Sequence, residues 1–390
     1  MFLPSVAQLT SDMVRIESIN PGPAGEDVVG RREADISRFV AEWLQERGIV
    51  CERYEFLPGR FNVSAVVAGS GPRRLLLDAH TDTVPTEGMA GDPLSGEIRD
   101  GKVIGRGACD DKGTLAAAMC ALAEMVADGV QPPATIELLA SGDEEGGFRG
   151  IRDWVALGGR ADGAIVGEAS ELGLIAASKG ALRCKIRTHG KSVHTSVPEL
   201  GVNAVAHMAR VICALEDRLK PQLATRQHPL LGTPRLTVSM IRGGWRANVV
   251  PDDCEIDIDR RVLPEETRES VLAELDGALA ELAAADPTLR VTREEPYGFV
   301  PAPECPLDDA LLLTAAAALR AEGLPAEPRG VPYTTHASVL AEAGIPCITI
   351  GPGNIDQAHS TEEWVEVTQL EQAVRIYRRI FETFEGGDGG

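Results

Sequence analysis

Four short apolar runs in the first and last parts of the chain have the pattern of buried strands. They span residues 74–79, 135–140, 163–167 and 345–350. Their apolar residues do not alternate with polar ones, which is typical of parallel strands covered on both faces. Helical patterns lie between them, among them 114–127, which ends before Gly129, and 306–322, which ends before Gly323. This alternation predicts an α/β domain with a mostly parallel sheet and helices on both of its faces.

The middle of the chain has a different pattern. In residues 182–188 and 254–259 the apolar positions alternate with charged ones, as they do in strands with one face in water. The predicted elements are a strand at 181–188, a helix at 203–219, strands at 235–241 and 253–261, a helix at 265–284 and a strand at 289–294. This is the β-α-β-β-α-β order of a ferredoxin-like domain. We therefore expect residues 180–294 to be inserted between two halves, 1–179 and 295–390, of the α/β domain.

The composition supports a globular chain of two domains. With 390 residues, the chain exceeds the size at which a single hydrophobic core usually stops growing. Hydrophobic residues make up 44% and charged residues 25%, which is typical of a soluble enzyme. No segment approaches the roughly 18 consecutive apolar residues of a membrane span, and the first residues lack the basic and apolar regions of a secretory signal. We therefore expect a cytoplasmic protein.

The net charge and the cysteines exclude several kinds of partner and site. A formal net charge of −21 repels phosphate backbones and anionic lipids, so we expect no nucleic acid and no membrane partner. The eight cysteines are scattered and form no CxxC pair, which argues against a disulfide framework and a cysteine-ligated zinc site. We expect reduced thiols and a frayed glycine-rich end at residues 386–390.

A polar cluster follows each of the four apolar runs. The residues are His80 and Asp82 after the first run, Glu144 and Glu145 after the second, Glu168 after the third and His359 after the fourth. In open α/β sheets ligands bind at the carboxyl ends of the strands, so these clusters can converge on one crevice. A fifth cluster, Asp110 and Asp111, precedes the helix at 114–127. Two histidines and several carboxylates in one crevice indicate a functional site.

Each cluster taken alone also has a purely structural interpretation. The i, i+2 spacing of His80 and Asp82 lets the carboxylate orient the imidazole, but such a pair is common by chance. The two aspartates before the helix could cap it, and residues 143–146 could form an acidic turn. Glu168 ends a buried run, where a charge is unfavourable unless it is paired or coordinated. Together, the five clusters favour one site over five unrelated structural roles.

Six segments resemble a known enzyme family, in the order in which that family has them. They are LLLDAHTDTVP, GRGACDDKG, SGDEEGG, VGEAS, GKSVHTSVPELGVNAV and GPGNIDQAHSTEEW. The family is the zinc-dependent one that includes acetylornithine deacetylase, succinyl-diaminopimelate desuccinylase and glutamate carboxypeptidase. The resemblance covers essentially the whole chain. It implies a two-metal amidohydrolase whose catalytic domain carries an inserted dimerisation and lid domain.

The resemblance implies a metal-binding role for the residues at the strand ends. Asp110 would bridge two divalent metal ions, His80 and Glu168 would complete one site, and Glu145 and His359 would complete the other. Imidazole and carboxylate ligands suit Zn²⁺, although Co²⁺ or Mn²⁺ could replace it. A cis peptide bond between Asp110 and the next residue is also implied.

Two further residues near the metals would serve catalysis directly. Asp82 would support His80. Glu144 would be the general base that takes a proton from the attacking water and returns it to the departing amine. The family resemblance is the ground for both roles.

In the inserted domain, the resemblance implies residues that contact the substrate. His194 resembles the family histidine that reaches the oxyanion from a neighbouring subunit, which implies a homodimer. Arg261 resembles the arginine that binds a substrate carboxylate, accompanied by Asn248, and Arg260 stays open as the alternative. Either arginine could instead be a solvated charge at a strand end. His336 is a further candidate for substrate binding, although it replaces an acidic residue of the family pattern, which leaves the contacts there open.

The last segment is closest to the deacetylase branch of the family. The leading hypothesis is therefore removal of the acyl group from a small N-acyl amino acid. A carboxypeptidase or dipeptidase of the same family would use the same chemistry with a different leaving group. A non-catalytic metal-binding scaffold would need a degraded site, and none of the expected ligands is missing.

Overall fold

A computed structural model describes residues 4–22 and 31–386, which form two compact units. The large unit comprises Met1–Ala176, Glu304–Arg329 and Thr335–Gly390, and the small unit comprises Ala177–Pro303 and Gly330–Thr334. In the sequence, the small unit therefore interrupts the large one. Residues 387–390 of the glycine-rich end, for which fraying is predicted, lie outside the described residues.

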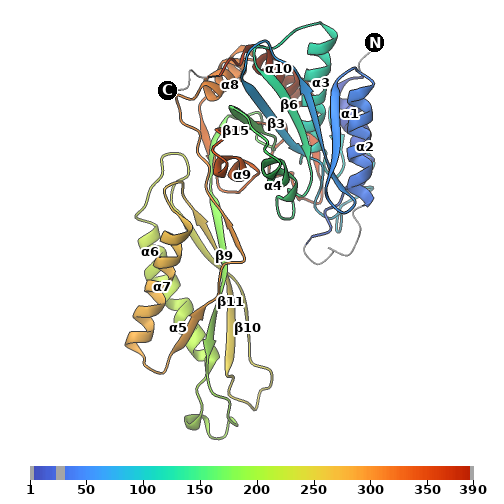
Figure 1. Ribbon diagram of the computed structural model, residues 1–390. Coiled ribbons are helices and arrows are strands. Elements are labelled where there is room, and N and C mark those ends of the chain that lie inside the picture. The colour runs from blue at the N-terminus through green and yellow to red at the C-terminus, as the bar shows by residue number, and fades with distance from the viewer. Residues whose placement is uncertain (1–3, 23–30, 387–390) are drawn as a thin grey trace. The chain divides into compact units, whose positions relative to one another are not determined.

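The main sheet of the large unit has eight strands in the order β1-β2-β6-β3-β7-β15-β8-β14. Figure 1 labels three of them, β6, β3 and β15. The strands are β1 (Val50–Leu57), β2 (Arg60–Val67), β3 (Arg74–His80), β6 (Thr135–Ser141), β7 (Gly163–Val166), β8 (Ile175–Ser178), β14 (Arg329–Val331) and β15 (Cys347–Thr349). The central strands β6, β3, β7 and β15 are parallel, and β1, β2 and β8 add antiparallel pairs. The four predicted apolar runs correspond to these central strands. The predicted α/β class with a mostly parallel sheet is confirmed.

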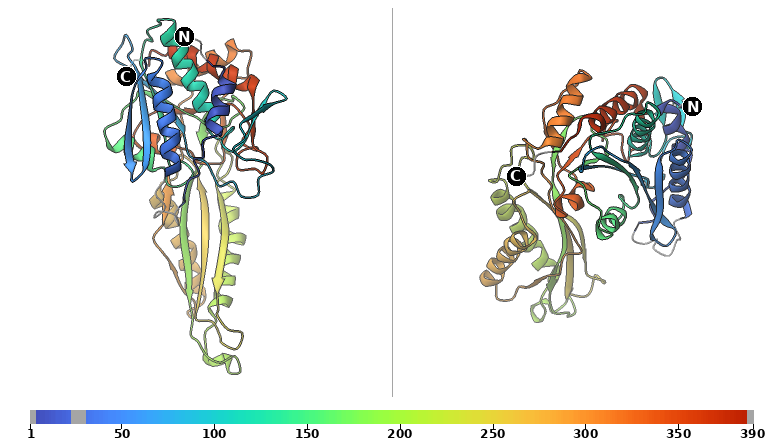
Figure 2. Two further views of the ribbon diagram at one scale, coloured as in Figure 1. Left: turned by 90° about the vertical axis from the view of Figure 1, so that its right-hand side faces the viewer. Right: turned by 45° about the horizontal axis from the view of Figure 1, so that its top comes forward.

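Helices cover both faces of this sheet (Figure 1, Figure 2). They are α1 (Val6–Val14), α2 (Arg31–Gln45), α3 (Lys112–Ala127), α4 (Arg149–Ala156), α8 (Ala310–Ala321), α9 (Ala337–Glu342) and α10 (Val367–Thr383). Helix α3 packs against α1 and α10, while α4 and α9 meet in a buried cluster that includes Leu76, Trp154 and Leu340. Residues Leu75 to His80 of β3 are all buried, which explains why the apolar residues of this strand do not alternate with polar ones.

Helix α3 is buried along most of its length. Its consecutive residues Ala116, Ala117 and Ala118 are completely buried, and their small side chains let neighbouring elements approach closely. Because the helix begins at Lys112, Asp110 and its neighbour lie at its N-terminal end, inside the large unit. A three-stranded sheet of β4 (Glu97–Arg99), β5 (Lys102–Ile104) and β16 (Trp364–Glu366) joins the chain before Asp110 to the chain after His359.

The small unit has the predicted order of elements. They are β9 (Gly180–His189), α5 (Ala204–Ala214), β10 (Arg235–Gly243), β11 (Asp253–Val262), α7 (Arg268–Ala285) and β12 (Arg290–Arg293). The strands form an antiparallel sheet in the order β10-β11-β9-β12, and β13 (Gly298–Val300) also pairs with β9. One face of the sheet packs on the helices through a buried cluster that includes Leu182, Ile256 and Leu275. The predicted helix at 203–219 ends as an α-helix at Ala214 and continues as a π-helical turn, Leu215–Leu219, and α6 (Lys220–Leu223).

All eight cysteines lie within the described residues and are free thiols. Burial raises the pKa of Cys120 and of Cys305 to about 12, which keeps both thiols protonated and unreactive. Among the helices that the structure describes, none is both long enough and apolar enough to span a bilayer.

Candidate metal centre

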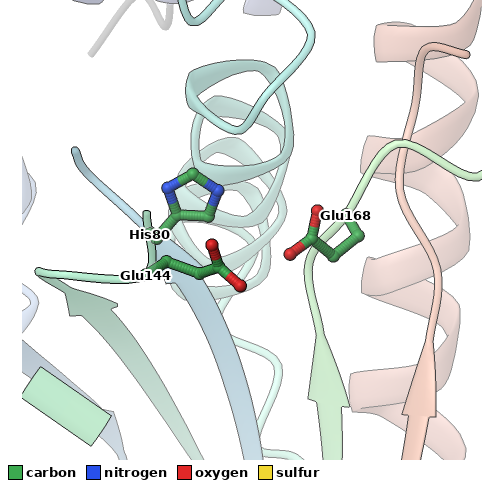
Figure 3. Close-up of side chains that lie close together, drawn as sticks. All are labelled: His80, Glu144 and Glu168. Carbon is green, nitrogen blue, oxygen red and sulfur yellow. The ribbon is translucent and has the colours of Figure 1, made fainter. Parts of the chain in front are cut away.

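Two groups of potential metal ligands lie at the carboxyl ends of the central strands. The first is His80 at the end of β3, Glu144 in the loop after β6 and Glu168 after β7; Figure 3 shows these three side chains directed toward a common space. The second is Asp110, Glu145 and His359. Within each group one potential ligand atom of every residue lies within 4.8 Å of the others. The structure thus brings together every residue that the resemblance implies as a metal ligand.

Asp110 connects the two groups. One of its carboxylate oxygens lies 2.8 Å from Nε2 of His80, and the other lies 3.3 Å from Nε2 of His359. Nε2 of His359 is also 2.9 Å from Oε1 of Glu145. Asp110 therefore has one oxygen toward each histidine, which is the arrangement that a ligand shared by two metal ions requires.

The segment around Asp110 has two further local features. The peptide bond between Asp110 and Asp111 is cis, as the resemblance implies. Asp111 stands at the N-cap position of α3, but its side chain makes no capping hydrogen bond there. Helix capping therefore does not account for this pair of aspartates.

Asp82 holds the loop that carries Glu144 and Glu145. Nδ1 of His80 lies 2.9 Å from the backbone oxygen of Asp82 and 3.7 Å from its carboxylate, so the carbonyl is the partner that orients the imidazole. The carboxylate accepts hydrogen bonds from the backbone amides of Glu144 and Glu145, both at 3.1 Å, and from Nδ2 of Asn20 at 2.7 Å. Asp82 thereby positions residues of both ligand groups.

A buried ionic network lies behind this loop, and the sequence analysis missed it. Asp143 is completely buried and accepts hydrogen bonds from Arg60 at 2.7 Å, Arg149 at 2.6 Å and Asn20 at 3.1 Å. Arg60 also pairs with the buried Glu33. These hydrogen bonds hold the pKa of Asp143 at about 2, against the effect of burial. The network fixes the loop at the residue directly before Glu144.

A second positioning pair, Arg106 and Glu363, was also missed. One carboxylate oxygen of Glu363 accepts hydrogen bonds from the backbone amides of Cys109 at 3.0 Å and Asp110 at 3.1 Å. The other accepts from Nη1 of Arg106 at 2.5 Å, and Nη2 of Arg106 donates to the backbone oxygen of Ser360 at 3.3 Å. Both side chains are almost completely buried. The pair therefore ties the segment of Asp110 to the residue after His359.

The electrostatics of the centre favour cations. Asp110 and Glu168 are buried, and Glu144 and Glu145 are partly buried. Burial raises the pKa of Glu144 and Glu168 well above the usual range, and neighbouring carboxylates raise it further. For Asp110, hydrogen bonds from His359 and His80 outweigh the effect of burial and hold the pKa low. Crowded carboxylates with imidazole nitrogens beside them are a donor set that fits two divalent metal ions.

The residues expected to contact the substrate lie in the small unit, with one exception. His194 is exposed, and its Nδ1 lies 2.8 Å from the hydroxyl of Ser196. The backbone oxygen of Asn248 accepts a hydrogen bond from the amide of Thr195, so the segments of His194 and Asn248 are neighbours within this unit. The structure therefore brings two of the expected residues side by side.

The structure distinguishes the two candidate arginines. Arg260 is completely buried, and its guanidinium lies 2.6 Å from Glu266 and 3.4 Å from Glu274. Arg261 is partly exposed and lies 2.8 Å from Asp259. The guanidinium of Arg260 is thus paired with acidic side chains in the core of the small unit. Arg261 is the arginine whose side chain is partly exposed and could contact a ligand.

His336 is the exception, because it lies in the core of the large unit. It is 1% exposed, its Nδ1 lies 2.7 Å from Asp78, and its ring packs edge-on against Phe148. This position leaves His336 no surface for a substrate, which corrects the sequence-based expectation. The contact of Nδ1 with the Asp78 carboxylate and the burial of the ring are the physical reason.

The comparisons with known proteins agree with this geometry. The model of Peptidase family M20/M25/M40 matches residues 76–383. The acetylornithine deacetylase of Proteus mirabilis (strain HI4320) is 32% identical over 391 residues, which cover 98% of this chain and 97% of that protein. The fold is similar to that of aminopeptidase PepT from Bacillus cereus (TM-score 0.78, 20% identity, 97% of both chains). It is also similar to that of the Bacillus subtilis YXEP protein, a dinuclear metal-binding peptidase (TM-score 0.75, 14% identity, 98% of both chains). The chain belongs to peptidase family M20/M25/M40, whose members hydrolyse amide bonds.

Proposed function

We propose that the protein is a two-metal amidohydrolase that removes the acyl group from an N-acyl amino acid. The observation that carries this proposal is the Asp110 carboxylate between two histidine-containing ligand groups, with Glu144 beside them. The relationship to an acetylornithine deacetylase supports an acyl amino acid as the substrate. A carboxypeptidase or dipeptidase activity would use the same residues and differs only in the leaving group.

The metal ligands in this proposal are those that the resemblance implies. His80 and Glu168 would hold one ion, Glu145 and His359 would hold the other, and Asp110 would be shared. We expect Zn²⁺, with Co²⁺ as the alternative, because imidazole and carboxylate ligands suit both ions. When bound, two such ions supply a water of lowered pKa and polarise the substrate carbonyl.

The protein residues move the protons. In this assignment Glu144 is not a metal ligand. Its carboxylate is directed to the same space as the side chains of His80 and Glu168. It would accept the proton of the attacking water and donate it to the departing amine nitrogen. The backbone of Glu144 is held by Asp82, so the base is positioned before the substrate arrives.

We propose that residues 180–294 form an inserted domain through which two copies of the chain pair. Strand β10 is an edge strand, and Met240, Ile241 and Trp245 on it and beyond its end are exposed. In such a homodimer His194 would stabilise the oxyanion in the partner's site, while Arg261 and Asn248 would bind the substrate carboxylate. We also propose a cytoplasmic location, where the free cysteines would stay reduced.

A hydrolysis screen tests this function directly. The zinc-loaded protein would be assayed against N-acetyl, N-succinyl and N-formyl amino acids and against simple dipeptides. We expect at least one acylated amino acid to be cleaved with a higher kcat/KM than any dipeptide. Cleavage of dipeptides alone would favour the peptidase alternative. A loaded protein that cleaves nothing would favour a metal-binding scaffold.

A further inference from the structure

The polar face of the small-unit sheet carries a ladder of matched charges. The central strand β11 contributes Glu255, Asp257 and Asp259 to this face, and its neighbours contribute basic residues. The acids pair across the strands with Lys185 at 2.8 Å, Arg242 at 3.0 Å and Arg183 at 2.9 Å, in that order. Oppositely charged neighbours of this kind stabilise a sheet.

The last row of the ladder breaks this pattern. The next residue of β11 on the polar face is Arg261, and its register partners are Arg235 on β10 and Ala181 on β9. Two arginines therefore stand opposite each other, and like charges in that position are destabilising. Arg261 has to share Asp259 with Arg183. Arg235 is exposed and pairs with none of the acidic side chains in the part of the chain that the structure describes.

Lys179 adds a third cation to this row. It precedes β9 by one residue, and its ammonium group donates a hydrogen bond to the backbone oxygen of Thr233, close to the start of β10. The side chain is buried, with 4% of the residue exposed. Burial lowers the pKa of Lys179, and the positive charges of Arg235, Arg260 and Arg261 lower it further, while Glu266 acts in the opposite direction. Three positive charges and one acid therefore act on this ammonium group.

We refer to Lys179, Arg235 and Arg261 as the cationic row. A local excess of positive charge is unusual in a chain whose net charge is −21. Such an excess becomes favourable when an anion occupies it, and it also attracts anions that the rest of the protein repels. Guanidinium groups bind carboxylates through two parallel hydrogen bonds, and the ammonium adds a point charge beside them.

We propose that the cationic row is a binding site for a small molecule with two carboxylate groups. Arg261 would bind one carboxylate and the exposed Arg235 would bind the other, with the buried charge of Lys179 adding to the positive field. If the occupant is the substrate, which rests on the proposed function, the row selects acyl amino acids that carry a second carboxylate. The same chemistry would also accept a free dicarboxylate that acts as an effector.

Binding of succinate to the full-length, metal-loaded protein tests the site. Calorimetry would compare the wild type with Arg235→Gln and with the control Arg242→Gln. Arg242 is also exposed on β10 and on the same face, but its row contains acidic partners. We expect Arg235→Gln to weaken succinate binding about tenfold or more, and Arg242→Gln to change it less than about twofold. Lys179→Gln should act in the same direction as Arg235→Gln.

Equal effects of Arg235→Gln and Arg242→Gln would overturn the proposal, because only the general field of the protein would then matter. So would equal binding of succinate and uncharged succinamide. Melting curves of each variant would establish that it is folded. The binding experiment does not depend on hydrolysis, so it stays informative even if the proposed enzymatic function fails.

A kinetic experiment separates the two possible occupants. N-acetyl-L-glutamate and N-acetyl-L-glutamine differ only in the charge of the side chain. If the substrate occupies the row, Arg235→Gln should lower kcat/KM for the glutamate derivative about tenfold and leave that for the glutamine derivative unchanged. If a free dicarboxylate occupies it, succinate should alter the rate without competing with the substrate, and Arg235→Gln should abolish that response. Absence of both effects would contradict the proposal.

Discussion

The two units of the protein concentrate opposite charges. The large unit gathers Asp110, Glu144, Glu145 and Glu168 at the ends of its parallel strands. The small unit ends an otherwise balanced ladder with a row of cations, Lys179, Arg235 and Arg261. In each unit the excess charge is unfavourable without a ligand of the opposite sign. This difference is the basis on which we propose metal cations for the large unit and a carboxylate anion for the small one.

Removal of the metal ions should have the largest effect, because it leaves the carboxylates of the large unit without cations. Chelation should abolish hydrolysis, because the carboxylates of the large unit would lose both their neutralising charge and the ions that activate water. It should also lower Tm, since ligands that bind only the folded state stabilise it. Activity assays and melting curves before and after dialysis against a chelator measure both effects. A metal-free preparation with full activity would rule out the mechanism.

The base in the anionic centre can be tested without disturbing the metals. Glu144→Gln should lower kcat by about 10²–10⁴, because the amide cannot accept the proton of the attacking water. The metal content of the variant should equal that of the wild type. Loss of metal from Glu144→Gln would mean that Glu144 is a ligand and that its assignment as the base is wrong.

The Arg106–Glu363 pair should affect metal affinity, because it positions Asp110. Glu363→Gln removes the charge that binds Arg106 and the two backbone amides, and we expect metal affinity to fall about 10–100-fold. The control is Glu362→Gln, because Glu362 is the exposed neighbour in the same segment. Titration of each apoprotein with Zn²⁺ measures the affinity. Similar values for both variants would show that Glu363 does not position Asp110.

The cationic side of the contrast should respond more mildly. Arg261→Lys keeps the charge but loses the paired hydrogen bonds. For a substrate with a free α-carboxylate, kcat/KM should therefore fall by a factor that corresponds to about 1–3 kcal/mol of lost transition-state stabilisation. The matching α-amide should lose much less. Kinetics on the acid and the amide measure the difference. Equal losses would assign Arg261 to structure rather than to carboxylate binding.

The smallest expected effect is the partial recovery of activity in a mixture of two inactive variants, which would follow from pairing of the subunits. If His194 serves the partner's site, mixing inactive His194→Ala with inactive Glu144→Gln should restore roughly a quarter of wild-type activity after subunit exchange, because half of the dimers would each have one intact site. Activity of the mixture and an independent measurement of exchange are needed. No recovery in spite of exchange would place His194 in the site of its own chain.

In the large unit, the sequence analysis found some residues of the site and missed others. His80 and Glu168 could be found because each directly follows a buried apolar run, and His359 because it lies in the loop after another such run. Asn20 and Glu363 could not, because their partners Asp82 and Asp110 lie 62 and 253 positions away and no spacing marks them. Residues of this kind become visible only through tertiary contacts.

For the arginines, the sequence contained a signal that could have decided between them. Cys254, Ile256 and Ile258 are the inward positions of β11, so strand alternation places Arg260 inside and Arg261 outside. Arg235 carries no such signal, because its importance depends on the register between β10 and β11. The burial of His336 carries no such signal either, because its partner Asp78 lies 258 positions away in the sequence.

The number of bound metal ions tests the central claim most directly. After loading and dialysis, elemental analysis of the wild type should give two divalent ions per chain. His359→Ala should retain one of them, because His80, Glu168 and Asp110 would remain in place, whereas Asp110→Asn should weaken both. A fully active wild type with a single ion per chain, or an Asp110→Asn variant that binds two ions as tightly as the wild type, would contradict a shared aspartate at the centre of the site.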